Sequence, residues 1–137
     1  MEDLTLIIPA KNEPESLPSV LEEIKDFNCE KIIILESSDT ETINSIKKFN
    51  YQLIYQSGKG YGDALIDGIN NVKTDYLCIF NADGSFDPRE LKQMLSLCKN
   101  NYDLIFASRY MKNSGSEDDT FLTKIGNFIF TLIGKIF

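Results

Sequence analysis

The sequence contains no histidine and no tryptophan, and its three cysteines are far apart, at Cys29, Cys78 and Cys98. Without histidine, these residues cannot supply a histidine-based catalytic triad, a histidine general base or a zinc site of the Cys/His kind. No Cys-x-x-Cys pair is present either. We therefore expect free thiols in a reducing cytoplasm, with Cys78 and Cys98 acting as small buried apolar side chains.

Positive charge is also scarce. Lys and Arg number 14 against 21 Asp and Glu, which gives a net charge of −7. A nucleic-acid-binding protein needs a basic face to meet phosphates, so we expect no nucleic-acid partner. The start, "MEDLTLIIPAKNE", lacks the basic stretch and small-residue cleavage site of a signal peptide, which favours a cytoplasmic location. The 42% apolar content suits one compact soluble domain.

Short apolar runs alternate with segments of helical periodicity along most of the chain. The apolar runs at residues 4–9, 31–35, 51–55, 76–80 and 102–108 predict strands. Strands that alternate with helices of about ten residues indicate βαβ units and right-handed crossovers. We therefore predict an α/β fold with a mostly parallel sheet of about five strands and helices on both faces.

Two of the predicted helices carry start signals. Asn12 precedes the periodic apolar residues between Leu17 and Phe27 and is the expected N-cap of that helix. Asp87 is the expected cap of a helix through Leu91, with Pro88 at its first position.

The last segment, residues 121–137, has a wide apolar face with Lys124, Asn127, Thr131 and Lys135 opposite. It is short for a membrane span and carries two lysines, so we predict an amphipathic helix, either interfacial or part of an incomplete acceptor region. The predicted organisation is a core at residues 1–110, a polar loop at 111–120 and this helix at 121–137.

Polar segments follow the predicted strands at the ends where they leave the sheet. They read "PAKNE", "ESSDT", "QSGKGYGD", "NADGS" and "SRY". Each segment alone is also compatible with a solvated turn. Because ligands of open parallel sheets bind beyond the carboxyl ends of the strands, the shared position of these segments predicts a binding site.

The residue types in two of these segments favour a phosphate-bearing ligand. The carboxylate of Asp83 supplies the hard oxygen ligand that Mg²⁺ and Mn²⁺ prefer. Proteins often hold such an ion through only one or two carboxylates, and the phosphates of the substrate supply further ligands. "GKGYG" allows close backbone approach to a phosphate, with Lys59 adding charge, although it lacks the Gly-Lys-Ser/Thr of a Walker A loop.

An ordered set of motifs closely resembles family 2 glycosyltransferases, and among them the polyprenyl-phosphate (dolichol-phosphate type) mannosyl- and glucosyltransferases. The motifs are "LIIPAKNEPESLPSVL", "IIILESSDTET", "GKGYGDALIDGI", "YLCIFNADGSFDPREL" and "LIFASRY". The resemblance implies a GT-A nucleotide-binding sandwich. It also implies inverting transfer of a sugar from a nucleotide sugar, UDP-glucose or GDP-mannose, to a polyprenyl phosphate or a glycan at the cytoplasmic membrane face.

The resemblance assigns a set of residues to the nucleotide-sugar donor. They are Pro9, Ala10, Asn12, Glu13, Glu36, Lys59, Asn81, Ala82 and Asp83. Asn81-Ala82-Asp83 matches the family's Asp-x-Asp motif, whose last aspartate binds the metal ion, and Ser85 is a second expected metal contact. The implied cofactor is Mg²⁺ or Mn²⁺.

Asp83 and Arg109 are the expected catalytic residues, and Arg109 and Lys124 are expected to meet the acceptor's phosphate. A phosphate acceptor is already nucleophilic, so the reaction needs little help from a general base.

Departures from the family pattern favour an alternative hypothesis. Asn81 replaces the first aspartate of Asp-x-Asp, Ser37 replaces a second acid, and Ser85 stands where relatives often carry glutamine. The acidic and Gly-Phe segment that completes the acceptor site in relatives is also unmatched. The alternative is a truncated or degenerate, non-catalytic module that binds nucleotide sugar or a membrane surface. A flavodoxin-like signalling domain is disfavoured, because no acidic cluster follows the first strand.

Overall fold

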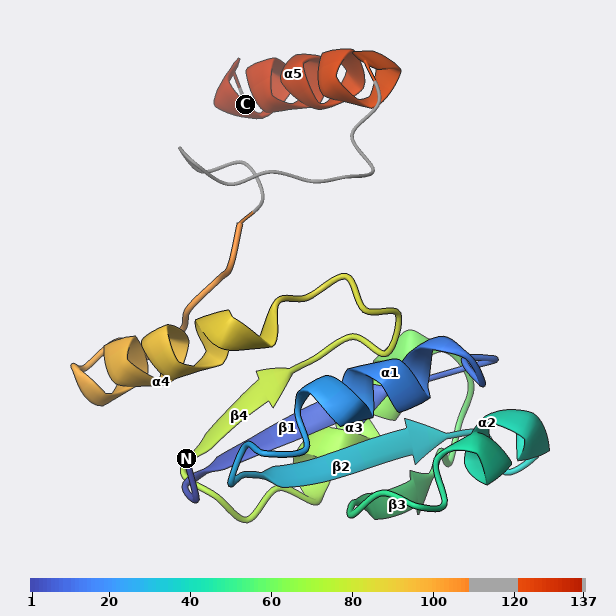
Figure 1. The fold of residues 1–137 in the computed structure, drawn as a ribbon. Coiled ribbons are helices and arrows are strands. Elements are labelled where there is room, and N and C mark those ends of the chain that lie inside the picture. The colour runs from blue at the N-terminus through green and yellow to red at the C-terminus, as the bar shows by residue number, and fades with distance from the viewer. Residues whose placement is uncertain (109–120, 137) are drawn as a thin grey trace. The chain divides into compact units, whose positions relative to one another are not determined.

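A computed structural model describes residues 1–108 and 121–136, which fall in two compact units, Met1–Asp103 and Leu104–Phe137. The first unit alternates strands and helices in chain order (Figure 1). Its elements are β1 (Leu4–Pro9), α1 (Ser16–Glu23), β2 (Glu30–Leu35), α2 (Thr40–Ser45), β3 (Gln52–Tyr55), α3 (Tyr61–Asn70), β4 (Tyr76–Ile79), the 3₁₀ turn η1 (Pro88–Glu90) and α4 (Leu91–Lys99). The second unit contains α5 (Phe121–Ile136).

The sheet of the first unit has four parallel strands in the order β3-β2-β1-β4. In the register of the central strand β1, Ile7 lies between Ile32 of β2 and Ile79 of β4. Because the chain adds β2 and β3 on one side of β1 and β4 on the other, the strand order reverses between β1 and β4. This arrangement confirms the predicted parallel α/β fold.

Helices cover both faces of the sheet, as predicted (Figure 1). Leu17 and Leu21 of α1 and Leu91 of α4 belong to the core cluster on one face. On the other face, Ala64 of α3 packs with Ile7 of β1 and with Ile32 and Ile34 of β2. All six residues of β1 are buried, Thr5 included, which explains why its apolar residues do not alternate with exposed polar ones.

Gly68 allows α3 to approach the sheet closely. A Cβ atom at this position would lie 2.6 Å from Ile7 Cγ2 and 2.9 Å from Ile34 Cδ1. Such distances are below van der Waals contact, so with any larger residue either α3 or the side chains of Ile7 and Ile34 would have to shift. The glycine therefore sets the distance between the helix and the strands that carry the first two loops of the sheet edge.

The predicted fifth strand is wrong. Residues 102–108 form no strand, and the side chains of Leu104 and Phe106 are 68% and 79% exposed. A strand requires a neighbour with a free edge and a matching register, whereas an apolar run specifies neither. The number of strands among the described residues is thus four rather than five.

The predicted cap of α1 is also wrong, whereas the cap at Asp87 is confirmed. The N-cap of α1 is Glu15, and Asn12 instead has a left-handed backbone with φ 56°. Asp87 accepts a hydrogen bond from the N–H of Arg89 and begins η1, with Pro88 at its first position. Local sequence identified the cap at Asp87 because its partner lies two residues away.

The second unit consists, in its described part, of residues 104–108, which form neither helix nor strand, and the helix α5. A helix is therefore present at Phe121–Ile136, within the segment for which an amphipathic helix is predicted. Its Phe128 and Phe130 are 69% and 74% exposed. Among the helices of the described residues, none combines the length and the apolar character needed to cross a membrane.

Candidate functional site

Four loops leave the same edge of the sheet. Because all the strands are parallel, the loops at residues 10–13, 36–39, 56–60 and 80–85 start from the carboxyl ends of β1, β2, β3 and β4. Ligands of open α/β sheets bind at this edge, in the crevice where the strand order reverses. In this chain the reversal lies between β1 and β4, beside the loops that contain Asn12 and Asp83.

The loops after β1 and β2 are joined by side chains. Lys11 Nζ forms an ion pair with Glu36 Oε1 at 2.7 Å. The N–H of Asn12 donates to Asp39 Oδ2 at 2.7 Å. The structure therefore brings the predicted donor residues Asn12 and Glu36 into one network, and Glu36 already has a cationic partner.

A further contact joins these loops behind the exposed surface. The N–H of Glu13 donates to Thr42 Oγ1 at 2.9 Å, and Thr42 is fully buried. Pro9 and Ala10 precede this contact and are buried, and the N–H of Ala10 donates to the carbonyl of Ile34 at 3.0 Å. The backbone of Pro9 and Ala10 is thus part of the sheet edge, whereas their side chains face the interior.

The loop after β3 is held to the first turns of α3. The N–H of Lys59 donates to Asp63 Oδ2 at 2.8 Å, and the N–H of Ser57 donates to Asp67 Oδ2 at 2.7 Å. Gly60 is the N-cap of α3 and has φ 87°, a conformation that L side chains rarely adopt. The carboxylate of Asp63 orders this loop, and the side chain of Lys59 is exposed.

The turn after β4 presents Asp83 to solvent. Phe80 and Ala82 are buried and anchor the turn in the core, and Phe80 meets Phe86 edge to face at 5.7 Å. Asp83 Oδ1 accepts a hydrogen bond from the N–H of Ser85 at 2.9 Å. Gly84 between them has φ 77°. This local geometry explains why a glycine follows Asp83.

The same turn carries the other two predicted contacts of the β4 loop. Asn81 Nδ2 donates to Ser85 Oγ at 3.4 Å. No cluster of three or more His, Cys, Asp or Glu suited to a metal ion occurs among the described residues. The donor set of this turn, one carboxylate with an amide and a hydroxyl, fits a Mg²⁺ or Mn²⁺ ion that takes its remaining ligands from a diphosphate and water. It does not form a metal site that is complete by itself.

The two residues predicted to meet the acceptor cannot be compared with this geometry. Arg109 lies outside the described residues. Lys124 lies in α5, and its side chain is outside the described part of the chain.

Sequence reasoning missed Asp39 and Thr42. Asp39 directly before the residues of α2 is a helix-start signal, and it does cap α2 by accepting from the N–H of Thr42 at 3.2 Å. The signal predicts only that local bond. The contacts of both side chains with the loop after β1 span 27 and 29 residues, and no local pattern encodes them.

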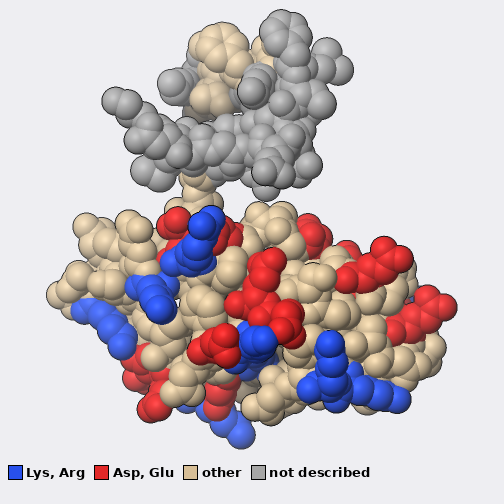
Figure 2. Space-filling view, viewed as in Figure 1, with Lys and Arg blue, Asp and Glu red and all other residues tan. Residues whose placement is uncertain are grey.

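Charges on the first unit are mixed. In the view of Figure 2, acidic and basic side chains alternate over the described surface, without a continuous basic patch on this face. A phosphate-bearing ligand at the sheet edge would therefore depend on local groups, such as the exposed ammonium of Lys59 and that of Lys11, which is paired with Glu36.

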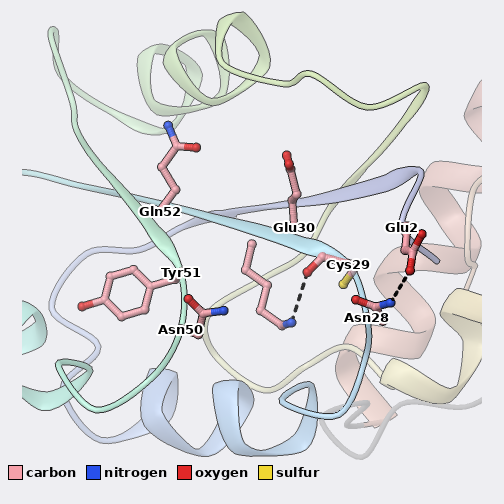
Figure 3. A pocket seen from close by; sticks show the side chains of 8 residues that line it. Glu2, Asn28, Cys29, Glu30, Asn50, Tyr51 and Gln52 are labelled. Atoms are coloured by element: carbon pink, nitrogen blue, oxygen red, sulfur yellow. Dashed lines mark hydrogen bonds between the residues drawn. The ribbon is translucent and has the colours of Figure 1, made fainter.

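A hollow at the opposite edge of the sheet holds none of the predicted site residues. It is lined by Glu2, Asn28, Cys29, Glu30, Lys31, Asn50, Tyr51 and Gln52, at the amino-terminal ends of β2 and β3 (Figure 3). Lys31 Nζ donates to the carbonyls of Phe27 and Cys29 at 2.9 and 3.3 Å. Because the ammonium group of Lys31 is bound to backbone carbonyls, we propose no ligand for this hollow.

The cysteines of the first unit are free and half-buried. Burial, with smaller contributions from Cys29 and Cys98, raises the pKa of the Cys78 thiol to about 11. The thiolate that acts as a nucleophile is therefore scarce at neutral pH, which fits the predicted role of Cys78 as an apolar core residue.

Comparison with known proteins identifies the family. The profile described as Glycosyl transferase family 2 matches residues 5–135. A dolichol-phosphate mannosyltransferase of Pyrococcus furiosus is 25% identical over 142 residues, which cover 97% of this chain and 40% of the relative. A dolichyl-phosphate hexose transferase of Haloferax volcanii is 26% identical over 137 residues, covering 98% of this chain and 59% of the relative.

An uncharacterized glycosyltransferase of Mycobacterium tuberculosis is 27% identical over 106 residues, covering 77% of this chain and 48% of the relative. The chain thus spans about half the length of the curated relatives that it matches. The family match, together with the parallel sheet, confirms the GT-A fold class that the motifs implied. This chain belongs to glycosyl transferase family 2.

Proposed function

We propose that this chain is the donor-binding part of a hexosyltransferase that moves a sugar from UDP-glucose or GDP-mannose to a polyprenyl phosphate. The observation that carries the proposal is the meeting of four polar loops at the carboxyl edge of the sheet, with the Asn81–Ser85 turn beside the reversal of strand order. The names of the two archaeal relatives support the choice of a lipid-phosphate acceptor over a glycan.

In this proposal the loops after β1, β2 and β3 hold the nucleotide. Pro9, Ala10, Asn12 and Glu13 line one side of the nucleotide, and Glu36 lies beside them through its ion pair with Lys11. The exposed ammonium of Lys59 adds positive charge near the diphosphate. These contacts bind and orient the donor before the transfer step.

Asp83 and Ser85 would hold Mg²⁺ or Mn²⁺, with Asn81 hydrogen-bonded to Ser85. When bound, such an ion neutralises the negative charge that develops on a departing nucleoside diphosphate. The bond from the N–H of Ser85 orients the Asp83 carboxylate before the ion arrives, which lowers the cost of ordering this side chain on binding.

On the acceptor side, we assign Arg109 and Lys124 to the phosphate of the polyprenyl lipid. The acceptor oxygen attacks the anomeric carbon directly, with inversion, and needs no general base because the phosphate is already ionised. The exposed Phe128 and Ile129 of α5 would lie in the membrane interface with the lipid. Co-sedimentation with polyprenyl-phosphate liposomes that survives deletion of residues 121–137 would remove this assignment of α5.

The transfer itself is tested with the intact chain, radiolabelled donor, Mn²⁺ and liposomes that contain polyprenyl phosphate. We expect labelled lipid from the wild-type chain and none from Asp83→Asn. Asp26→Asn is the matched control, because Asp26 is exposed and lies between α1 and β2, at the other edge of the sheet. Equal transfer by the wild type and Asp83→Asn would contradict the role of Asp83.

A second candidate function is a non-catalytic module that binds nucleotide sugar. It is favoured by Asn81, because an amide that donates to Ser85 brings no charge to a metal ion. Donor binding without any labelled lipid in the same assay would favour this second function. Transfer by the intact chain would exclude it.

A further inference from the structure

The turn after β1 adopts a backbone conformation that its sequence alone does not favour. Asn12 has φ 56°, in the left-handed region, and its side chain is exposed. Asparagine tolerates this region better than most residues, but an isolated turn would still exchange with right-handed and extended states. Something outside the turn must therefore select the left-handed state.

Two side chains of the next βα unit supply that selection. The carboxylate of Asp39 accepts from the N–H of Asn12 through Oδ2 at 2.7 Å and from the N–H of Thr42 through Oδ1 at 3.2 Å. The hydroxyl of Thr42 accepts from the N–H of Glu13 at 2.9 Å. Two consecutive N–H groups of the turn are thus bound by residues that lie 27 and 29 positions away in the chain.

These contacts go beyond helix capping. Capping α2 requires only the bond from Thr42 N–H to Oδ1, and it does not require Oδ2 to face the loop after β1. Burial alone would raise the pKa of Asp39, but the hydrogen bonds from Asn12 and Thr42 outweigh it and hold the pKa below its usual value. The carboxylate therefore stays charged at neutral pH, and charge-assisted hydrogen bonds are the stronger kind.

We call the contacts of Asp39 and Thr42 with the N–H groups of Asn12 and Glu13 the clamp. The clamp is attached to a buried part of the fold. Thr42 is fully buried, and Ile46 at the end of α2 belongs to the main core cluster. The parallel pairing of β1 with β2, from Thr5 with Glu30 to Pro9 with Ile34, fixes the starting points of both loops. Movement of the turn would consequently break contacts with a rigid part of the sheet.

We propose that Asp39 is a positioning residue of the donor site, which together with Thr42 holds Asn12 and Glu13 in the backbone conformation that binds the nucleotide sugar. The inference rests on the proposed function, since it assigns Asp39 a part in the same donor site. Asp39 itself does not touch the donor. It acts through the backbone of the turn.

The test uses the intact chain and four variants. Asp39→Asn keeps the size of the side chain, but its amide has one oxygen only. Either the N–H of Asn12 or that of Thr42 would then face an NH₂ group, which cannot accept a hydrogen bond. Thr42→Val keeps the shape and removes the acceptor for Glu13. In Asp39→Asn/Asn12→Gly, glycine adopts the left-handed state without the cost of a Cβ atom. Asp3→Asn is the control, because it removes a carboxylate that pairs with Lys99, far from the loops of the carboxyl edge in the strand register.

Two measurements are made on each chain. Calorimetric titration with UDP-glucose or GDP-mannose and Mn²⁺ gives donor affinity, and amide hydrogen exchange of Asn12 and Glu13 reports the clamp without any ligand. We expect Asp39→Asn to weaken donor binding by about tenfold, the size of one lost charge-assisted hydrogen bond, and Thr42→Val, which removes a hydrogen bond between neutral groups, by about threefold. The added Asn12→Gly substitution should restore part of the affinity, and Asp3→Asn should bind like the wild type.

The two readouts separate failure of the inference from failure of the proposed function. If the wild type binds donor and Asp39→Asn binds it equally well, the inference is overturned. If the wild type binds neither nucleotide sugar, the proposed function fails, and the exchange rates alone decide on the clamp. In that case, unchanged protection of Asn12 and Glu13 in Asp39→Asn would show that Asp39 does not hold the turn. Faster exchange would show that it does.

Discussion

The two sides of the candidate site are built differently. The loops after β1 and β2 are joined by contacts between residues 25 to 29 positions apart, at Lys11–Glu36, Asn12–Asp39 and Glu13–Thr42. In the turn after β4, the bonds Ser85–Asp83 and Asn81–Ser85 join residues two and four positions apart. We infer that the turn after β1 is held more firmly in the free chain than the exposed tip of the β4 turn around Ser85.

The largest expected effect concerns the packing against β1 and β2, the strands from which the joined loops start. Gly68→Ala should lower the free energy of unfolding by about 1–3 kcal/mol, because the new methyl group meets Ile7 and Ile34 at distances below van der Waals contact. Urea denaturation measures this change. Gly62→Ala is the control in the same helix, since a Cβ atom at Gly62 would have no neighbour within 4 Å. Similar stability of both variants would mean that α3 does not depend on its close approach to β1 and β2.

The next effect compares the two sides directly. Thr42→Val should destabilise the chain by about 1–2 kcal/mol, because it leaves the N–H of Glu13 without its acceptor next to a fully buried side chain. Ser85→Ala, in the exposed turn, should change stability by no more than about 0.5 kcal/mol. Chemical denaturation of both variants gives the comparison. An equal loss of unfolding free energy in the two variants would mean that the turn after β1 is held no more firmly than the β4 turn.

Amide hydrogen exchange should sharpen the comparison at residue level. We expect slow exchange at Asn12 and Glu13 in the free chain, and exchange at Ser85 that is faster and slows when donor and Mn²⁺ are added. The reason is that local opening costs little where hydrogen bonds are exposed and short-range. If Ser85 is as well protected as Glu13 without ligand, the β4 turn is held as firmly as the turn after β1.

The smallest expected effect is the pH response just beyond the β4 turn. Side-chain and backbone hydrogen bonds from Arg89 lower the pKa of Asp87 to about 2. Because the folded-state pKa lies below that of the unfolded chain, the contribution of Asp87 to stability is complete above the unfolded pKa of about 3.9 and is lost as the pH falls towards 2. NMR titration should give this low midpoint. Arg89→Gln should move it up towards the usual value, and an unmoved midpoint would exclude Arg89 as the cause.

How much of this could be predicted from the sequence depends on the range of the interactions. The first four strands and the cap at Asp87 follow from apolar runs and from a partner two residues away. The fifth strand could not be judged in this way, because Leu104 and Phe106 are apolar without a pairing partner among the described residues. The prediction of Asn12 as a helix cap is wrong for a similar reason, because its N–H is bound by Asp39, 27 positions away in the chain.

The residues of the candidate site were also predictable only where their position depends on the order of the elements and not on long-range side-chain contacts. Parallel strands bring their carboxyl ends to one edge, so the positions of Glu36, Lys59 and Asp83 at that edge follow from the order of the elements alone. The sequence did not reveal that Glu36 is paired with Lys11 or that Asp63 is bound to the backbone of Lys59. These partners are side chains whose direction depends on packing.

The most direct test of the donor site is calorimetric titration of UDP-glucose and GDP-mannose into the intact chain, with and without Mn²⁺, with Asp83→Asn and Asp26→Asn in parallel. We predict that one of the two nucleotide sugars binds, that Mn²⁺ strengthens its binding by at least about tenfold, and that only Asp83→Asn loses this gain. Binding that is the same with and without Mn²⁺, or the same in Asp83→Asn and the wild type, would contradict the account.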